Sequence, residues 1–142
     1  MNGRLRLKAL ALIAPILLFE PAAARAQLPF DVTQDDLAAV DTARFSWPSL
    51  GTSMGGPSGE LDYLVEVSSE AECRAVGLLG MLRLRNYYMK RFDKRPVVLN
   101  LRVRCGPRYR GHIEYDGITT SFELREGPGG RVVYQGRVRG LP

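Results

Sequence analysis

Two cysteines, Cys73 and Cys105, are the only ones in the chain, and the stretch they bracket most constrains how the chain can fold. An apolar segment from Ser69 to about Phe92 predicts a long helix, and the alternating stretch 97–105 predicts a strand that ends at the second cysteine. A disulfide between them would staple this helix to this strand, contributing roughly 3 to 4 kcal/mol of stability. Redox-active pairs use a close Cys-x-x-Cys spacing, which is absent here, so we predict a structural bond.

The first residues carry the pattern of a secretory signal peptide. Arg4, Arg6 and Lys8 precede an apolar run over residues 9–19, and a small-x-small cleavage site ends at Ala26. The run is shorter than the about 20 apolar residues that span a bilayer, and we expect no transmembrane segment in the mature chain. We therefore predict a signal peptide at residues 1–26, cleavage after Ala26, and a periplasmic or secreted product in which the cysteines pair.

The rest of the sequence divides into two parts by composition. Residues 27–60 form an N-terminal segment with a candidate short helix at 31–40 and a Gly/Ser/Pro-rich stretch at 51–59, which we interpret as a flexible linker or exposed loop. Residues 61–142 carry the regular apolar patterns of the predicted α+β domain. Acidic residues concentrate before Cys73 and basic residues after it, so the mature protein should be unevenly charged.

The long predicted helix has an unusual distribution of apolar side chains. At 100° per residue they fall on two faces rather than one. Two glycines on the first face, Gly77 and Gly80, would let the helix lie close against a sheet, at a cost of about 1 kcal/mol each in helix propensity. The first face holds Cys73, Val76, Gly77, Gly80, Leu84 and Tyr87, and the second holds Ala71, Ala75, Leu78, Leu79, Leu82 and Met89.

The second helix face needs a cover, because large exposed apolar patches usually mark interaction sites. One cover is the N-terminal segment folding back over the helix, and the other is a partner protein or a second copy of the chain in a homodimer. We favour the intramolecular cover, and the two are compatible if that cover is partial. The side chains that would provide it are Phe30, Leu37, Val40, Phe45 and Trp47.

Aromatic and basic residues are interleaved at the end of the helix, between Arg83 and Arg95. Such a pattern can lie on an anionic membrane. We favour a structural interpretation, in which the aromatic rings join the core and the cations surround the helix C-terminus, where the helix dipole favours them.

The remaining pattern is that of β-strands. We predict a strand at Leu61–Val67 and continuous β-structure from Val97 to the end of the chain. The predicted fold is α+β, with one long helix on a four- to five-stranded antiparallel sheet in the order β-α-β-β-β-β. This order is similar to that of cystatin-like and monellin-like folds. The resemblance is topological and carries over no residues, since the inhibitory loop motif of a cystatin is absent.

The segment Tyr115-Asp-Gly-Ile118 predicts a two-residue type I′ turn. With that turn, Phe122 would lie opposite Gly111 on the core side and cover its bare backbone. On the other side, Arg110 would face Glu123.

Strand alternation predicts an arginine-rich second face of the sheet. Guanidinium groups bind carboxylates and phosphates in forked geometry, so the hypothesis is an anionic partner in the cell envelope. The alternative is a solvated face whose counter-charges come from the acidic N-terminal segment, and the sequence leaves both open. The candidate binding residues are Arg102, Arg104, Arg110, Arg125, Arg137 and Arg139.

An enzyme is the second class considered. His112, placed opposite Ser121 and near Glu114, would supply the residue types of a base, a nucleophile and an orienting acid. These residues fall on a flat strand face without a strained elbow or helix N-terminus to form an oxyanion hole. We therefore predict no catalytic residues, no metal and no cofactor.

The sequence thus predicts an exported binding or adaptor module that recognises an anionic or protein partner through the arginine-rich sheet face or the apolar helix face. Nucleic acid is not expected, because no recognised binding motif is present. The alternative function is a small hydrolase using Ser121 and His112.

Overall fold

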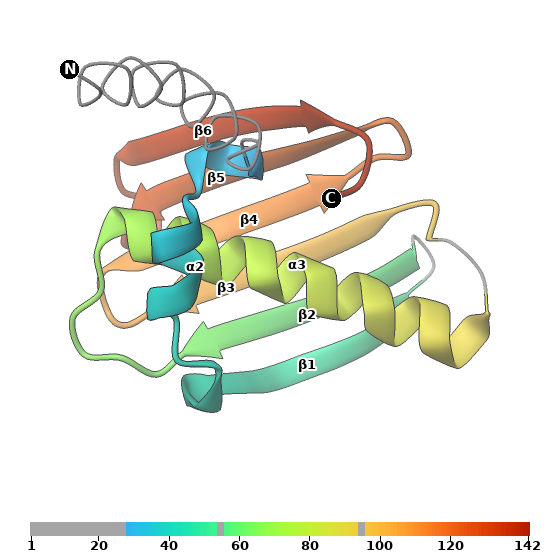
Figure 1. The fold of residues 1–142 in the computed structure, drawn as a ribbon, viewed down its shortest axis with the longest axis horizontal. Helices are drawn as coiled ribbons and strands as arrows, with labels where there is room; N and C mark the ends of the chain where they lie inside the picture. The colour runs from blue at the N-terminus through green and yellow to red at the C-terminus, as the bar shows by residue number, and fades with distance from the viewer. Residues whose placement is uncertain (1–27, 54–55, 94–95) are drawn as a thin grey trace, which may run out of the picture.

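The computed structural model describes residues 28–53, 56–93 and 96–142. The predicted signal peptide and its cleavage after Ala26 lie outside the described residues. One sheet forms the body of the described chain, and the helical elements lie against one of its two faces (Figure 1).

The described residues form six strands in the sheet order β1-β2-β3-β4-β5-β6. Neighbouring strands are antiparallel except β2 and β3, which are parallel. The α+β class with one long helix is confirmed, whereas the sheet has six strands and is mixed rather than four- to five-stranded and antiparallel, and β1 precedes the predicted order β-α-β-β-β-β. The elements are η1 (Pro29–Asp31), α2 (Gln34–Ala39), η2 (Thr42–Arg44), β1 (Phe45–Ser53), β2 (Gly56–Tyr63), α3 (Glu70–Phe92), β3 (Leu99–Cys105), β4 (Tyr109–Tyr115), β5 (Thr119–Glu126) and β6 (Val132–Arg139).

The additional strand is β1, and the stretch 51–59, predicted as a linker or exposed loop, contributes to both β1 and β2. Pro57, Gly59, Leu61 and Tyr63 alternate along β2 and are all buried towards the helix side. A Cβ on Gly59 would lie 3.3 Å from the backbone carbonyl oxygen of Ser49 on β1, which is tighter than most real contacts, and at an ordinary contact distance of 3.6 Å from the Leu84 side chain of α3. Gly59 therefore marks the close approach of β1 rather than a loop. The strand predicted at Leu61–Val67 instead begins earlier and ends at Tyr63.

The helix α3 crosses from the end of β2 to the start of β3, and this crossover makes the two strands parallel. Its first turn is capped by Ser69, whose Oγ accepts a hydrogen bond from the Glu72 backbone N–H at 3.0 Å. The predicted disulfide is confirmed, with 5.9 Å between the Cα atoms of Cys73 and Cys105. It joins the N-terminal part of α3 to the end of β3.

The two helix glycines lie where the helix meets the sheet, as predicted. A Cβ added to Gly77 would come within 2.7 Å of the ring of Phe122, and one added to Gly80 would come within 2.6 Å of Leu61. Both glycines are buried. The absence of a side chain therefore sets the distance between α3 and the sheet.

The N-terminal segment covers the first half of the second helix face, which places Ala75 and Leu78 in the core. Phe30 is only 3% exposed and packs edge to face on Phe122, with 5.2 Å between the ring centroids. The cover is partial, because Met89 near the end of the helix keeps 39% of its surface exposed. A second copy of the chain on the uncovered part stays a prediction.

Polar contacts anchor the same segment. Arg74 on α3 donates from Nη1 to the backbone carbonyl of Phe30 at 2.8 Å and to that of Asp31 at 2.7 Å. The hydroxyl of Tyr63 donates to Glu72 at 3.0 Å and accepts from the Asp41 backbone N–H at 3.2 Å. Burial raises the pKa of Tyr63, which keeps the hydroxyl protonated as the donor.

The turn between β4 and β5 differs from the predicted two-residue turn. Asp116 Oδ1 accepts hydrogen bonds from the N–H groups of Ile118 and Thr119, both at 2.8 Å, and Tyr115 pairs with Thr120. The register therefore shifts by two residues, which leaves each side chain on its predicted face. Phe122 pairs with Ile113 rather than Gly111.

Removing the disulfide should lower stability without changing the fold. We expect the double variant Cys73→Ala, Cys105→Ala to lose roughly 3 to 4 kcal/mol of unfolding free energy, since the unfolded chain gains entropy. Urea denaturation of the variant and of the reduced wild type measures this, and the two should agree. An unchanged urea midpoint in both would contradict it.

The close approach of α3 is tested by Gly77→Ala. The added methyl should destabilise by about 1 to 3 kcal/mol through overpacking against Phe122, partly offset by about 1 kcal/mol of helix propensity. Chemical denaturation measures the difference. Lys90→Ala, on the exposed part of the same helix, is the control and should stay within about 0.5 kcal/mol of wild type. A Gly77→Ala variant more stable than wild type would contradict the prediction, because it would show that the sheet and α3 can move apart to accept the methyl group.

Candidate functional site

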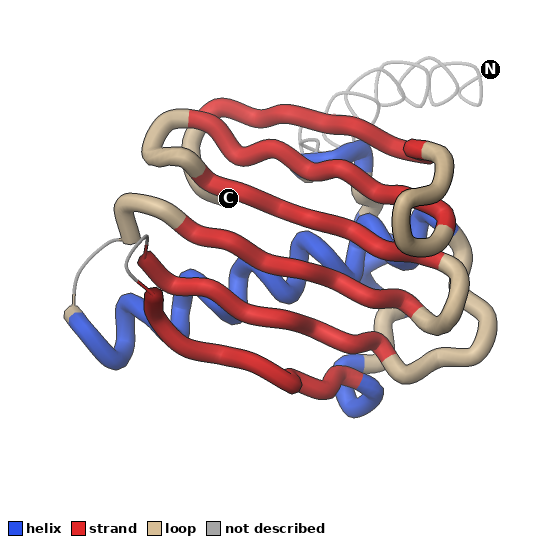
Figure 2. The backbone as a smooth tube through the Cα atoms, turned by 180° about the vertical axis from the view of Figure 1, so that it is seen from behind, coloured by secondary structure: helices blue, strands red, loops and turns tan. Residues whose placement is uncertain are grey.

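The face of the sheet opposite the helices is open along its whole width (Figure 2). Strand alternation directs the charged side chains of the strands to this side, while most of the apolar ones enter the core together with Thr120. We call it the open face. All six arginines named as candidates in the sequence belong to its strands, β3 to β6.

The charged residues of the open face align in rows that cross the strands. The first row places Asp62, Arg104, Arg110 and Arg125 side by side on β2 to β5. The predicted pairing of Arg110 with Glu123 is therefore wrong, because the two-residue shift brings Arg110 opposite Arg125. This row holds three guanidinium groups and one carboxylate, and only Arg104 pairs with that carboxylate.

The second row consists of Glu60, Arg102, His112, Glu123 and Gln135. The third contains Ser58, Asn100, Glu114, Ser121 and Arg137. Ser121 thus faces Glu114 and not His112, so the predicted opposition of serine and histidine is wrong. The hydrolase itself stays a prediction.

Arg104 has a fixed partner on the neighbouring strand. Its guanidinium forms a forked pair with Asp62, with Nε donating to Oδ1 at 3.0 Å. These hydrogen bonds, with the charge of Asp62, raise the pKa of Arg104 above its ordinary value. Arg104 therefore offers fewer free donors to a ligand than its position alone indicates.

Arg125 and Glu123 form a second pair, on the same strand. Arg125 Nε donates to Glu123 Oε1 at 2.8 Å, and Gln135 Nε2 donates to Oε2 at 3.2 Å. The hydrogen bond from Arg125 lowers the pKa of Glu123, and that from Gln135 adds to the effect. Arg125 also donates to the carbonyl of Gly130 at 2.9 Å, so both of its hydrogen-bonding edges are engaged.

The other four candidate arginines have no carboxylate within ion-pair distance among the described residues. Arg110 turns back and donates to the carbonyls of Tyr109 and Gly106. The guanidinium groups of Arg102, Arg137 and Arg139 are exposed and form no hydrogen bond or ion pair with a described residue, although backbone hydrogen bonds and, to a smaller extent, the charge of Arg137 lower the pKa of Asp116. These three are the free cations of the candidate site.

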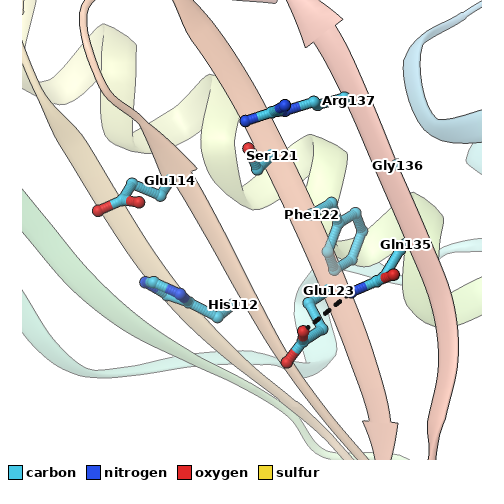
Figure 3. Close-up of a pocket in the computed structure, with 8 residues that line it drawn as sticks. All are labelled: His112, Glu114, Ser121, Phe122, Glu123, Gln135, Gly136 and Arg137. Atoms are coloured by element: carbon cyan, nitrogen blue, oxygen red, sulfur yellow. Dashed lines mark hydrogen bonds between the residues drawn. The ribbon is translucent and has the colours of Figure 1, made fainter.

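Shallow hollows lie between the rows, and His112 lines three of them. The largest has a volume of about 560 Å³ and extends from His112 to Arg137 (Figure 3). In this view Ser121 lies beside Arg137, while the imidazole of His112 lies apart from both. The imidazole Nε2 is 3.2 Å from Asn100 Oδ1. The hollow therefore presents a cation, a hydroxyl and an imidazole as separate binding groups, together with the carboxylates of Glu114 and Glu123.

Sequence reasoning missed the acidic part of this face. Glu60 and Asp62 stand on β2, next to the arginines of β3. The signal was present in the sequence, since Ser58, Glu60 and Asp62 alternate with Gly59, Leu61 and Tyr63. This alternation was missed because the glycines of the stretch 51–59 are typical of a loop. The counter-charge of Arg104 comes from Asp62 on β2, which lies just after the N-terminal segment that was expected to supply it.

Two other classes of site were sought among the described residues. No three His, Cys, Asp or Glu side chains there come together in a way that could hold a metal ion. None of the described helices combines the length and apolar character of a bilayer-spanning segment.

Comparison with protein-family models, with curated proteins and with solved structures finds no significant match to this chain.

The ion pair at the centre of the open face should be visible in the pH dependence of stability. The folded-state pKa of Glu123 is lowered. The contribution of its ionised carboxylate to the free energy of unfolding is therefore complete above the ordinary glutamate pKa of about 4.3, and it disappears as pH falls through the lowered value. We expect Glu123→Gln to lose about 0.2 to 1 kcal/mol at neutral pH. At about pH 3 the difference in unfolding free energy between wild type and Glu123→Gln should shrink.

Urea denaturation at both pH values measures this difference. Glu114→Gln is the control, because Glu114 lies on the same face and has no hydrogen-bond or ion-pair partner among the described residues. A difference for Glu123→Gln that is independent of pH would contradict the electrostatic origin.

Proposed function

We propose that this protein is an exported binding module whose open face recognises an anionic surface of a partner protein. The observation that carries the proposal is the set of three exposed arginines, Arg102, Arg137 and Arg139, which have no carboxylate partner among the described residues. Strand register and alternation place them on the open face.

The neighbours of these arginines favour a protein partner over a uniform polyanion. Glu60 stands beside Arg102, and Ser121 stands beside Arg137. A partner must therefore meet cations, carboxylates and neutral hydrogen-bonding groups in a defined pattern. Such a mixed pattern promotes specificity, because a misplaced like charge is repelled.

The flatness of the face supports the same class of ligand. The hollows are open, and the largest is lined by residues of three strands, β4 to β6, with polar and apolar surface in equal parts. Small-molecule sites bury most of their ligand and are mostly apolar. A flat, polar and partly paired face is closer to the composition of a transient protein interface.

A charge-reversal variant tests the proposal. The probe is a fluorescein-labelled peptide of alternating Glu and Ser residues, with binding followed by anisotropy at low and high salt. Arg102→Glu with Arg137→Glu should weaken binding about tenfold, which corresponds to roughly 1.4 kcal/mol. Wild-type binding should weaken as salt rises, because exposed charges are screened within about 8 Å at physiological ionic strength.

The matched control is Arg83→Glu with Lys90→Glu, which makes the same charge change on α3, on the other side of the sheet. It should leave peptide binding close to wild type. Equal weakening by both double variants would mean that net charge, and not the open face, attracts the peptide.

A further inference from the structure

A second hollow lies on the helix side of the molecule, between the edge strand β1 and the C-terminal half of α3. Its volume is about 300 Å³, at the lower end of the size of small-molecule sites. The exposed wall of this hollow is almost entirely apolar. It is lined by Trp47, Leu50, Arg83, Asn86, Tyr87 and Lys90.

A β-bulge builds the strand side of this hollow. Ser46 pairs with Asp62 and Ser49 with Glu60, so the two residues between them, Trp47 and Pro48, oppose the single residue Leu61. The extra residue turns Trp47 and Leu50 to the same side of the sheet, although regular alternation would place them on opposite sides. The bulge therefore brings an indole and an aliphatic side chain together against the helix.

The helix supplies the other wall and a cationic rim. The guanidinium of Arg83 lies 5.2 Å from the ring centroid of Phe45, and that of Arg91 lies 5.7 Å from that of Tyr87. Lys90 stands one turn beyond Asn86 on the same helix. Among the described residues that line the hollow there is no carboxylate.

We propose that this hollow binds a medium-chain fatty acid. The alkyl chain lies between Trp47, Leu50 and Tyr87, and the carboxylate is held at the rim by Arg83 and Lys90. Charge complementarity selects the head group, because the rim carries two cations and no described anion. The limited volume selects a single chain rather than a phospholipid with two.

The packing of the walls is consistent with a preformed site. The indole Cη2 of Trp47 would lie 3.8 Å from a Cβ on Gly80, so the ring rests against the helix backbone. Leu50 is 39% exposed, so its side chain offers apolar surface to a ligand in the hollow. Burying this surface under an alkyl chain would stabilise the complex by the hydrophobic effect. The site is separate from the open face and does not depend on the proposed function.

Trp47 makes the proposal directly measurable, because it is the only tryptophan in the chain. Laurate below its micelle concentration should shift the tryptophan emission to shorter wavelength with a saturable dependence. Dodecanol and dodecyltrimethylammonium, which carry the same chain with a neutral or cationic head, should bind about tenfold more weakly if the rim selects the carboxylate.

Two variants locate the ligand. Arg83→Glu with Lys90→Glu should raise the dissociation constant of laurate about tenfold, and Leu50→Asp should abolish the saturable shift by placing a charge in the hollow. Both change exposed positions, and circular dichroism verifies the fold. Arg102→Glu with Arg137→Glu on the open face is the control and should leave laurate binding unchanged.

Three outcomes would overturn the proposal. The first is no saturable emission shift with laurate, and the second is equal affinity for laurate and dodecanol. The third is a shift with vesicles of anionic phospholipid but none with laurate, which would make this surface a membrane contact instead. Failure here leaves the acidic-peptide test of the open face unaffected, so the two proposals fail independently.

Discussion

The close contact between α3 and the sheet is the interaction on which the rest of the structure depends. Gly77 and Gly80 leave room for Phe122 and Leu61 directly below the helix backbone, and the disulfide holds the beginning of the helix to the end of β3. A helix this close to the sheet fills the core with few side chains. Both of the candidate surfaces follow from this arrangement, one on each side of the sheet.

The crossover through α3 decides the electrostatics of the open face. Because it returns the chain parallel to β2, the acidic strand lies beside the first arginine strand, and Asp62 meets Arg104. Without that neighbour, Arg104 would lack its carboxylate partner, and Glu123 and Glu114 would be the acidic residues of the second and third rows. With it, paired charges lie among the exposed arginines. The open face therefore carries a defined arrangement of charges rather than a uniform positive field that attracts any anion.

The two sides of the molecule differ in how their polar groups are used. On the open face, hydrogen bonds from Arg125 and Gln135 lower the pKa of Glu123 and hold its carboxylate ionised. On the helix side, arginines stack on the rings of Phe45 and Tyr87 and keep their charge at the edge of an apolar hollow. Arginine thus forms ion pairs on the open face, whereas on the helix side it lines the edge of an apolar hollow.

By itself the sequence determined what depends on near neighbours along the chain. The cap at Ser69, the glycines of the helix and the alternation of β3 to β6 were all predictable, because each rests on local geometry. The six arginines were placed on their strands for the same reason. The register between β4 and β5 was missed by two residues, because Asp116 forms side-chain hydrogen bonds that the two-residue turn does not contain.

Only the tertiary structure decided which strands lie side by side. The hairpin of β1 and β2 has glycines and prolines where a strand usually has apolar residues, and it becomes recognisable only once α3 packs against Gly59. The bulge at Trp47 and the pairing of Asp62 with Arg104 follow from that hairpin. Strand order and register depend on contacts between residues that are distant in the sequence, so no local stretch of the chain is enough to predict them.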